Sequence, residues 1–231
     1  HGEALGAVID GVPAGLMFSL QDLQYQLDRR APGNIKGTTS RKEPDTAEVL
    51  SGIFKQKTMG TPIAVIIRNT DQRSKDYDKI KTDPRPGHAD QTYNDKYGIR
   101  DHRGGGRSSG RETVSRVIGG YFAGLIIKNI RVRAYIREMG PFHFQEKLPH
   151  LNADLGPYSF PDLTEIKNIE KYLIDLKKNG ESVGGRISIQ VDDCPKGLGE
   201  PAFDKLKADL AKGLMSIGAV VSFSYGLGEE F

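Results

Sequence analysis

One stretch constrains this chain more than any other: residues 85–112, which read RPGHADQTYNDKYGIRDHRGGGRSSGRE. It holds two histidines, five arginines and three consecutive glycines shortly before a pair of serines. Directly after it, apolar residues recur at the spacing of one helix face, which predicts a buried amphipathic helix. Those residues are Val114, Val117, Ile118, Tyr121, Phe122 and Leu125. A cationic, glycine-rich turn at the mouth of a helix favours anion binding.

The helix is predicted to begin near Ser109, because Glu112 follows three residues later in the pattern of a capping box. Its first turn would present free N–H groups and the positive end of the helix dipole. Arg107 and Arg111 add full charges there, and the three glycines at 104–106 let the backbone approach a ligand closely. The pattern is typical of a site for a phosphate or a phosphate-bearing cofactor.

Two other interpretations stay open on these residues alone. A capped helix after a glycine turn is most often only a structural feature. The RGGGR segment also resembles the Arg-Gly segments that bind RNA while disordered. The absence of a repeat, and the ordered helix that follows directly, weigh against the second interpretation.

Several motifs closely resemble the signature of the chorismate synthase family, flavin-dependent enzymes that make chorismate from 5-enolpyruvylshikimate 3-phosphate. The resemblance spans essentially the whole chain. Its motifs are RPGHAD, YGIRDHRGGGRSS and RET in residues 85–113, HG at His1–Gly2, SRKEPD at Ser40–Asp45, GLGEPAFDKLKADLA at 197–211 and LMSI at Leu214–Ile217.

The resemblance implies an α/β layered fold, a β-α-β sandwich, in one domain over residues 1–231 that assembles as a homotetramer when full length. It also implies that the chain begins inside the family's first motif. The chain stops before a later Arg-His-Asp-Pro segment, so the fold is expected to be incomplete at the C-terminus. On that basis we expect these 231 residues alone to be inactive.

The implied activity is a lyase reaction of the shikimate pathway of aromatic amino-acid biosynthesis, a 1,4-anti elimination of phosphate. The family requires reduced FMN although no net redox change occurs, and NADPH is the candidate reductant. The residues that match the family's site are His1 and His88 for catalysis, Arg30, Lys36, Ser109 and Arg111 for the substrate, and Arg107, Ser108, Ser109, Gly218 and Ala219 for the flavin.

Three positions depart from the family's pattern. Lys36 stands where the family usually has arginine, and lysine keeps the charge but loses the bidentate geometry. Gly110 replaces an alanine, and Gly218 stands where asparagine or proline is common. The two glycines are expected to change backbone freedom more than chemistry.

Composition excludes several classes of function. The net charge is only +3, so a general polyanion binder is not indicated. The single cysteine, Cys194, excludes an internal disulfide and offers no zinc set. The longest apolar run, Val117 to Ile127, is too short to cross a bilayer. With no secretion signal visible, a soluble protein of the reducing cytoplasm is expected, without a metal, nucleic-acid or membrane partner.

Periodicity predicts alternating strands and helices, and their order indicates α/β layering. The helices begin near Ser19 and Ser109 and at a cap on Asp162, with a short one at 88–97 and a last one from Phe203 to Ile217. The expected strands are Ala4–Asp10, Val49–Phe54, Ile63–Arg68, Val132–Glu138, Ile187–Val191 and Val220–Tyr225.

Two rival functions remain. A different phosphate-binding enzyme would share the glycine turn and the arginines but would need no flavin, so a flavin titration separates it. An Arg-Gly nucleic-acid-binding module would instead bind arbitrary RNA in a salt-dependent manner.

Overall fold

A computed structural model of the chain describes residues 2–31, 45–69, 83–148 and 154–228. The chain divides into two compact units, each with its own sheet and core. The first comprises His1–Arg30, Asp45–Ile126 and Lys196–Phe231, and the second Ala31–Pro44 and Ile127–Pro195. The expectation of a single domain stays a prediction.

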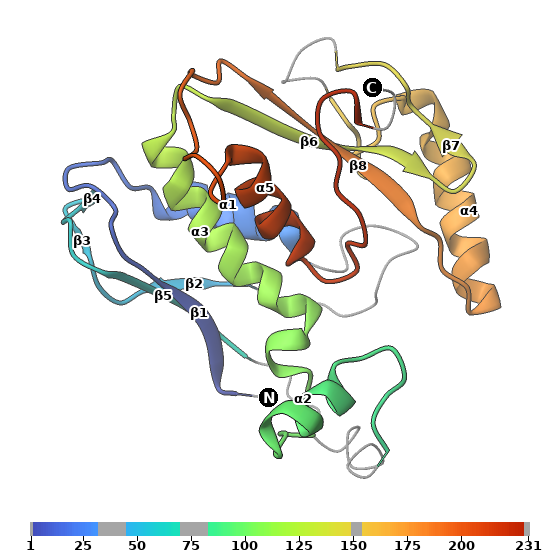
Figure 1. Ribbon diagram of the computed structural model, residues 1–231, viewed down its shortest axis with the longest axis horizontal. Coiled ribbons are helices and arrows are strands. Elements are labelled where there is room, and N and C mark those ends of the chain that lie inside the picture. The colour runs from blue at the N-terminus through green and yellow to red at the C-terminus, as the bar shows by residue number, and fades with distance from the viewer. Residues whose placement is uncertain (1, 32–44, 70–82, 149–153, 229–231) are drawn as a thin grey trace. The chain divides into compact units, whose positions relative to one another are not determined.

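The sheet of the first unit has three antiparallel strands in the order β1 (Ala4–Ile9), β5 (Ile63–Arg68), β2 (Ala47–Val49) (Figure 1). The central strand β5 is rich in β-branched residues, which suit a pleated and half-buried surface. Its side chains alternate between the two faces, so one face is buried completely. The fully buried residues are Ile63, Val65 and Ile67.

Two helices, α1 (Leu20–Arg30) and α3 (Thr113–Ile126), pack against each other, and α3 also packs against β1. The predicted apolar stripe of α3 faces this core: Val114, Ile118 and Phe122 are fully buried. Gly6 lets the backbones of β1 and β5 lie close, because a Cβ at this position would overlap the carbonyl oxygen of Val65.

The remaining elements of the first unit are short. The hairpin of β3 (Ile53–Phe54) and β4 (Lys57–Thr58) turns through two residues with positive φ. Helix α2 (Asp90–Tyr97) ends at a left-handed glycine, Gly98, and α5 (Leu206–Met215) follows much later in the chain. Single 3-10 turns at Gly106–Ser108 and Gly110–Glu112 lead into α3.

In the second unit a three-stranded antiparallel sheet has the order β7 (Phe142–His143), β6 (Arg131–Met139), β8 (Gly185–Asp192). A bulge in β6 between Ile136 and Glu138 shifts its register with β8. Helix α4 (Ile166–Asn179) buries Ile169 beside Phe160 and ends at Gly180 in the left-handed conformation. The predicted Asp162 cap forms, because its Oδ1 accepts from the Thr164 N–H at 2.9 Å.

Two of the predicted strands are wrong. The one expected at Val49–Phe54 is split, because Gly52 has φ of 79° and turns the chain between β2 and β3. Val220–Tyr225 forms no strand, since no described strand pairs with it. The last helix forms but is shorter than the predicted span from Phe203 to Ile217. Most of its large apolar residues stay exposed, and Phe203, just before it, is 90% exposed.

The length and the hydropathy of a helix decide whether it could cross a membrane. Within the described ranges, no helix combines the length and the apolar character that a bilayer crossing requires.

Candidate active site

Two of the predicted substrate-binding arginines meet on one buried carboxylate. Arg30 Nη1 lies 2.6 Å from Asp45 Oδ2, and Arg111 Nη2 lies 3.1 Å from Asp45 Oδ1. The Asp45 side chain is fully buried, whereas 19% and 17% of the arginine side chains remain accessible. Each arginine therefore forms an ion pair with a different oxygen of the carboxylate, and the Arg30 contact is also a charge-assisted hydrogen bond.

The start of α3 sets the position of Arg111. Ser109 is extended, and its Oγ accepts from the Arg111 N–H at 3.2 Å, so the predicted serine cap is confirmed. The other half of the capping box does not form, since the Glu112 carboxylate pairs with Arg116 at 3.0 Å. The turn before α3 is 3-10, so the α-helix itself begins at Thr113 rather than at Ser109.

Thr113 links this turn to α1. Its Oγ1 donates to the Gly110 carbonyl at 2.8 Å and accepts from Arg30 Nε at 3.3 Å. Arg30 is therefore held by its Nη1 on Asp45 and its Nε on Thr113. A guanidinium with both positions fixed needs little reorganisation to meet an anion.

The predicted flavin-contacting run lies on the preceding turn. Gly105 lies close to the next turn, because a Cβ here would lie 3.1 Å from the Ser109 Cα and the backbone would have to shift slightly to admit it. Arg107 is exposed and makes no hydrogen bond or ion pair with another described residue. Ser108 is half-buried next to it. An exposed guanidinium on a turn that also carries two serines can bind an anionic group.

The other predicted flavin contact, Gly218 with Ala219, follows α5. Arg116 of α3 donates to the Ser216 hydroxyl at 2.9 Å and to its carbonyl at 3.0 Å, which ties the end of α5 to α3. Ala219 has φ of 68°, a left-handed conformation that a side chain rarely adopts. The structure thus connects this turn to the helix that begins at the predicted anion site.

His88 belongs to a second charged cluster, around Asp90. His88 Nδ1 lies 3.2 Å from Asp90 Oδ1, and the same carboxylate pairs with Arg85 and Arg100. Hydrogen bonds from Arg85, aided by the charge of Arg100, hold the pKa of the Asp90 carboxyl far below its usual range. His88 retains 28% of its side-chain exposure, so part of the imidazole is accessible.

Two predicted site residues, His1 and Lys36, lie outside the described residues. The others that the structure describes all fall in the first unit. Arg30 and Arg111 are brought together through Asp45, and Ser109 caps the turn that carries Arg111. His88 instead contacts Arg85 and Asp90.

Asp45 and Asp90 were not singled out from the sequence. Each is the last residue of a motif already recognised there, SRKEPD and RPGHAD. An acid that closes a motif containing basic residues is the signal that points to such residues, because a buried carboxylate needs compensating charge.

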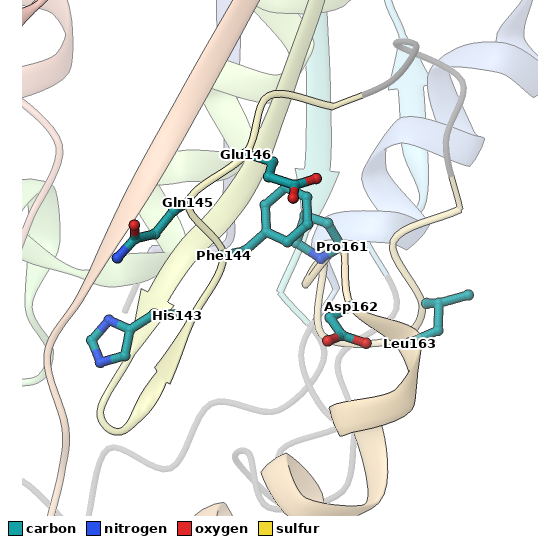
Figure 2. A pocket seen from close by; sticks show the side chains of 7 residues that line it. All are labelled: His143, Phe144, Gln145, Glu146, Pro161, Asp162 and Leu163. Atoms are coloured by element: carbon teal, nitrogen blue, oxygen red, sulfur yellow. The ribbon is translucent and has the colours of Figure 1, made fainter.

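The second unit carries a separate open hollow of about 730 Å³. Figure 2 shows that its side chains come from β7 with the residues after it and from the loop before α4. The lining residues are His143, Phe144, Gln145, Glu146, Pro161, Asp162 and Leu163. None of them is a predicted site residue, and His143 is exposed as the sequence indicated. Among the described residues, no group of three or more His, Cys, Asp or Glu side chains could hold a metal ion.

Comparison with known proteins places the whole chain in one family. A sequence model described as chorismate synthase matches residues 1–231. A solved structure titled "Crystal Structure of Chorismate Synthase" is similar with a TM-score of 0.78 and 28% sequence identity. The match covers 100% of this chain and 67% of that chain. The predicted fold class, mixed helices and strands arranged as in that family, is confirmed.

Proposed function

The chain belongs to the chorismate synthase family, and from this premise we propose that it carries the substrate site of an enzyme that converts 5-enolpyruvylshikimate 3-phosphate to chorismate and phosphate, with these 231 residues alone expected to be inactive. The family implies a lyase role in chorismate formation. The specific reaction proposed is a 1,4-anti elimination in which a carbon–hydrogen bond and the carbon–oxygen bond to phosphate break. The electron pair of the carbon–hydrogen bond forms a double bond, the double bond already present shifts, and the hydrogen is lost in net as a proton. The bonding pair of the broken carbon–oxygen bond leaves with the phosphate.

The observation that carries the proposal is the meeting of Arg30 and Arg111 on Asp45. Two guanidinium groups and one carboxylate leave one net positive charge. Both arginines keep accessible surface, and the Ser109 hydroxyl lies at the same turn. Such a clamp suits the carboxylate and phosphate groups of the substrate, since charge-assisted bonds to a fixed guanidinium are strong. Lys36 is proposed as a further cation.

Two histidines are proposed for proton transfer. His1 would give a proton to the departing phosphate, and His88 would hold or supply a proton near the flavin ring. His88 has a fixed Nδ1 side and a partly accessible ring, which is the arrangement that proton transfer requires.

Arg107, Ser108 and Ser109 would hold reduced FMN together with Gly218 and Ala219. The exposed guanidinium of Arg107 and the adjacent hydroxyls fit an anionic cofactor. When bound, reduced FMN supplies an electron-rich ring without a net redox change. The proposal also includes NADPH as the reductant, a homotetramer as the assembly and the cytoplasm as the location.

Binding tests the proposal on the chain itself. We expect calorimetric titration with 5-enolpyruvylshikimate 3-phosphate and with FMN to give saturable binding of both. Arg107→Ala should lose flavin affinity selectively. Arg103→Ala is the matched control, because Arg103 is an exposed arginine that pairs locally with Asp101 at 2.8 Å. Absence of binding of either ligand would contradict the proposal, and salt-dependent binding of arbitrary RNA would favour a nucleic-acid module instead.

The reaction is tested by phosphate release with reduced FMN under anaerobic conditions, in a chain that also carries the family's later Arg-His-Asp-Pro segment, because the 231 residues alone are expected to be inactive. Replacement of His88 by alanine should lower turnover about 10–10⁴-fold, the scale for loss of a general acid or base. His143→Ala serves as the control, because His143 is exposed and lies outside the proposed site. Equal turnover in both variants would remove His88 from the mechanism.

A further inference from the structure

Asp90 is a buried carboxylate with an unusually full set of partners. Only 4% of its side chain is exposed. Its Oδ2 accepts from the Arg85 backbone N–H at 3.1 Å and from Arg85 Nε at 2.8 Å, and it lies 3.2 Å from Arg100 Nη1. Its Oδ1 accepts from Arg85 Nη2 at 3.0 Å and lies 3.2 Å from His88 Nδ1. The two arginines therefore hold the Asp90 carboxylate in place, and its Oδ1 also faces the His88 imidazole.

The hydrogen on His88 Nδ1 follows from this geometry. Arg85 grips Asp90 side-on, through Nε on one oxygen and Nη2 on the other, and this fork determines where the Nη2 hydrogens point. Arg85 Nη2 also lies 3.2 Å from His88 Nδ1. The three atoms Nη2, Nδ1 and Oδ1 thus lie within 3.2 Å of one another. Arg85 can only donate, so a bond from Nη2 would need Nδ1 without a hydrogen, whereas a bond to Asp90 needs one there. Nη2 already has a closer acceptor in Asp90 Oδ1 at 3.0 Å, while an Nδ1 without a hydrogen would set its lone pair 3.2 Å from that carboxylate oxygen.

We propose that Asp90 is a positioning residue, which accepts a hydrogen bond from His88 Nδ1–H and so leaves Nε2 as the atom that exchanges a proton with the reacting groups. This inference rests on the proposed function, in which His88 transfers a proton. Arg85 and Arg100 contribute indirectly, because they hold the Asp90 carboxylate and that carboxylate orients the His88 imidazole. The logic is that of other catalytic histidines, where a partner on one ring nitrogen sets the tautomer.

The charge state of Asp90 supports the same assignment. Its pKa is held far below the usual range by the hydrogen bonds from Arg85, so the group is a carboxylate throughout the neutral range. An ionised carboxylate can only accept hydrogen bonds. Its one contact with the imidazole therefore requires the hydrogen to lie on Nδ1.

Nitrogen NMR of the full 231-residue chain tests the tautomer without any ligand. Histidine side chains are labelled with ¹⁵N, the His88 signals are identified by their loss in His88→Gln, and spectra are recorded where the ring is neutral. We expect the correlation pattern of the Nδ1–H tautomer. If His88 in the unaltered chain carries its hydrogen on Nε2, the inference is wrong, whatever the variants show.

Asp90→Asn gives the second test. The asparagine oxygen can still accept from Arg85 and Arg100, and its NH₂ group then faces His88 Nδ1 and donates to it. We expect His88 to change to the Nε2–H tautomer in the 231-residue chain, and turnover to fall about 10²–10⁴-fold in a chain that also carries the later Arg-His-Asp-Pro segment. Asp101→Asn is the matched control, because Asp101 pairs with Arg103 at 2.8 Å but has no histidine beside it. An unchanged His88 tautomer in Asp90→Asn would overturn the inference.

The outcomes separate this inference from the proposed function. Full turnover in His88→Ala removes the histidine from the reaction, while the tautomer measurement still stands. Conversely, an Nε2–H tautomer in the unaltered chain, together with inactive His88→Ala, leaves the function intact and removes Asp90 from it.

Discussion

Arg30 Nη1 lies 2.6 Å from Asp45 Oδ2, an ion pair that ties the last turn of α1 to the residues just before β2. Gln24 reinforces the same junction, because its side chain donates to the Asp45 carbonyl and accepts from the Ala47 N–H. The arginine that we propose for substrate binding is therefore held by the fold before any ligand arrives.

Removal of the shared carboxylate should destabilise the first unit. Asp45→Ala leaves Arg30 and Arg111 close together without their counter-charge, and breaking a buried pair in this way costs about 3–5 kcal/mol. Urea denaturation measures the change in the free energy of unfolding. Asp101→Ala is the control: it breaks an exposed pair with Arg103 and should cost about 0–1 kcal/mol. Equal losses in the two variants would contradict the role given to Asp45.

Arg111→Ala should weaken binding of the phosphorylated substrate by roughly 1.5–3 kcal/mol, the scale of a hydrogen bond to a charged group. Calorimetric titration measures the affinity, with Arg103→Ala as the control. Lys36→Arg should bind equally well or better, because arginine restores a bidentate fork. Normal substrate affinity in Arg111→Ala, together with early thermal unfolding, would assign Arg111 to the structure of the helix start alone.

Much of the local structure could be predicted because its signals are local. The Ser109 and Asp162 caps, the apolar stripe of α3 and the left-handed Gly180 after α4 depend on residues a few positions apart. The strand expected at Val220–Tyr225 failed for the opposite reason. A strand needs a partner, and composition does not say whether one lies alongside.

In the candidate site, too, residues carried by local motifs could be predicted, whereas their long-range contacts could not. Recognised motifs pointed to Arg30 and Arg111, but nothing in their spacing shows that both would contact one carboxylate. Asp45 and Asp90 escaped notice because an acid in a polar segment usually faces solvent, and only the fold buries these two. Which residues pair across long distances in the sequence is decided by the tertiary fold.

Acid should reveal the contribution of Asp90 to stability. Its pKa in the folded chain is depressed, so the stability it confers is complete above the ordinary carboxyl pKa of about 3.9 and is lost as the pH falls toward the folded value. We expect the difference in unfolding free energy between the unaltered chain and Asp90→Asn to shrink below about pH 4. Denaturation from about pH 5 to pH 2.5, below the ordinary imidazole pKa of about 6.5, measures it, and acid effects on groups that do not contact Asp90 cancel in the difference. A constant difference would contradict the depressed pKa.

Tyr121 should stabilise the contact between α1 and α3 through its hydroxyl. The group accepts from the Ser19 N–H at 2.9 Å and donates to the Ser19 carbonyl at 3.0 Å, directly before α1 begins, and burial raises the pKa of the phenol. Tyr121→Phe leaves both backbone groups without this partner in a partly buried place, which should cost about 1–3 kcal/mol.

Urea denaturation of Tyr121→Phe measures this loss, and Tyr25→Phe is the matched control, because Tyr25 lies on α1 with 61% of its surface exposed. The control should change the unfolding free energy by less than about 0.5 kcal/mol, as most exposed substitutions do. Amide hydrogen exchange at Ser19 adds a local readout, since its N–H donates to the phenol only in the unaltered chain. Protection of that amide in Tyr121→Phe equal to the unaltered chain would mean that another group takes over the bond, and the hydroxyl would then not hold the two helices together.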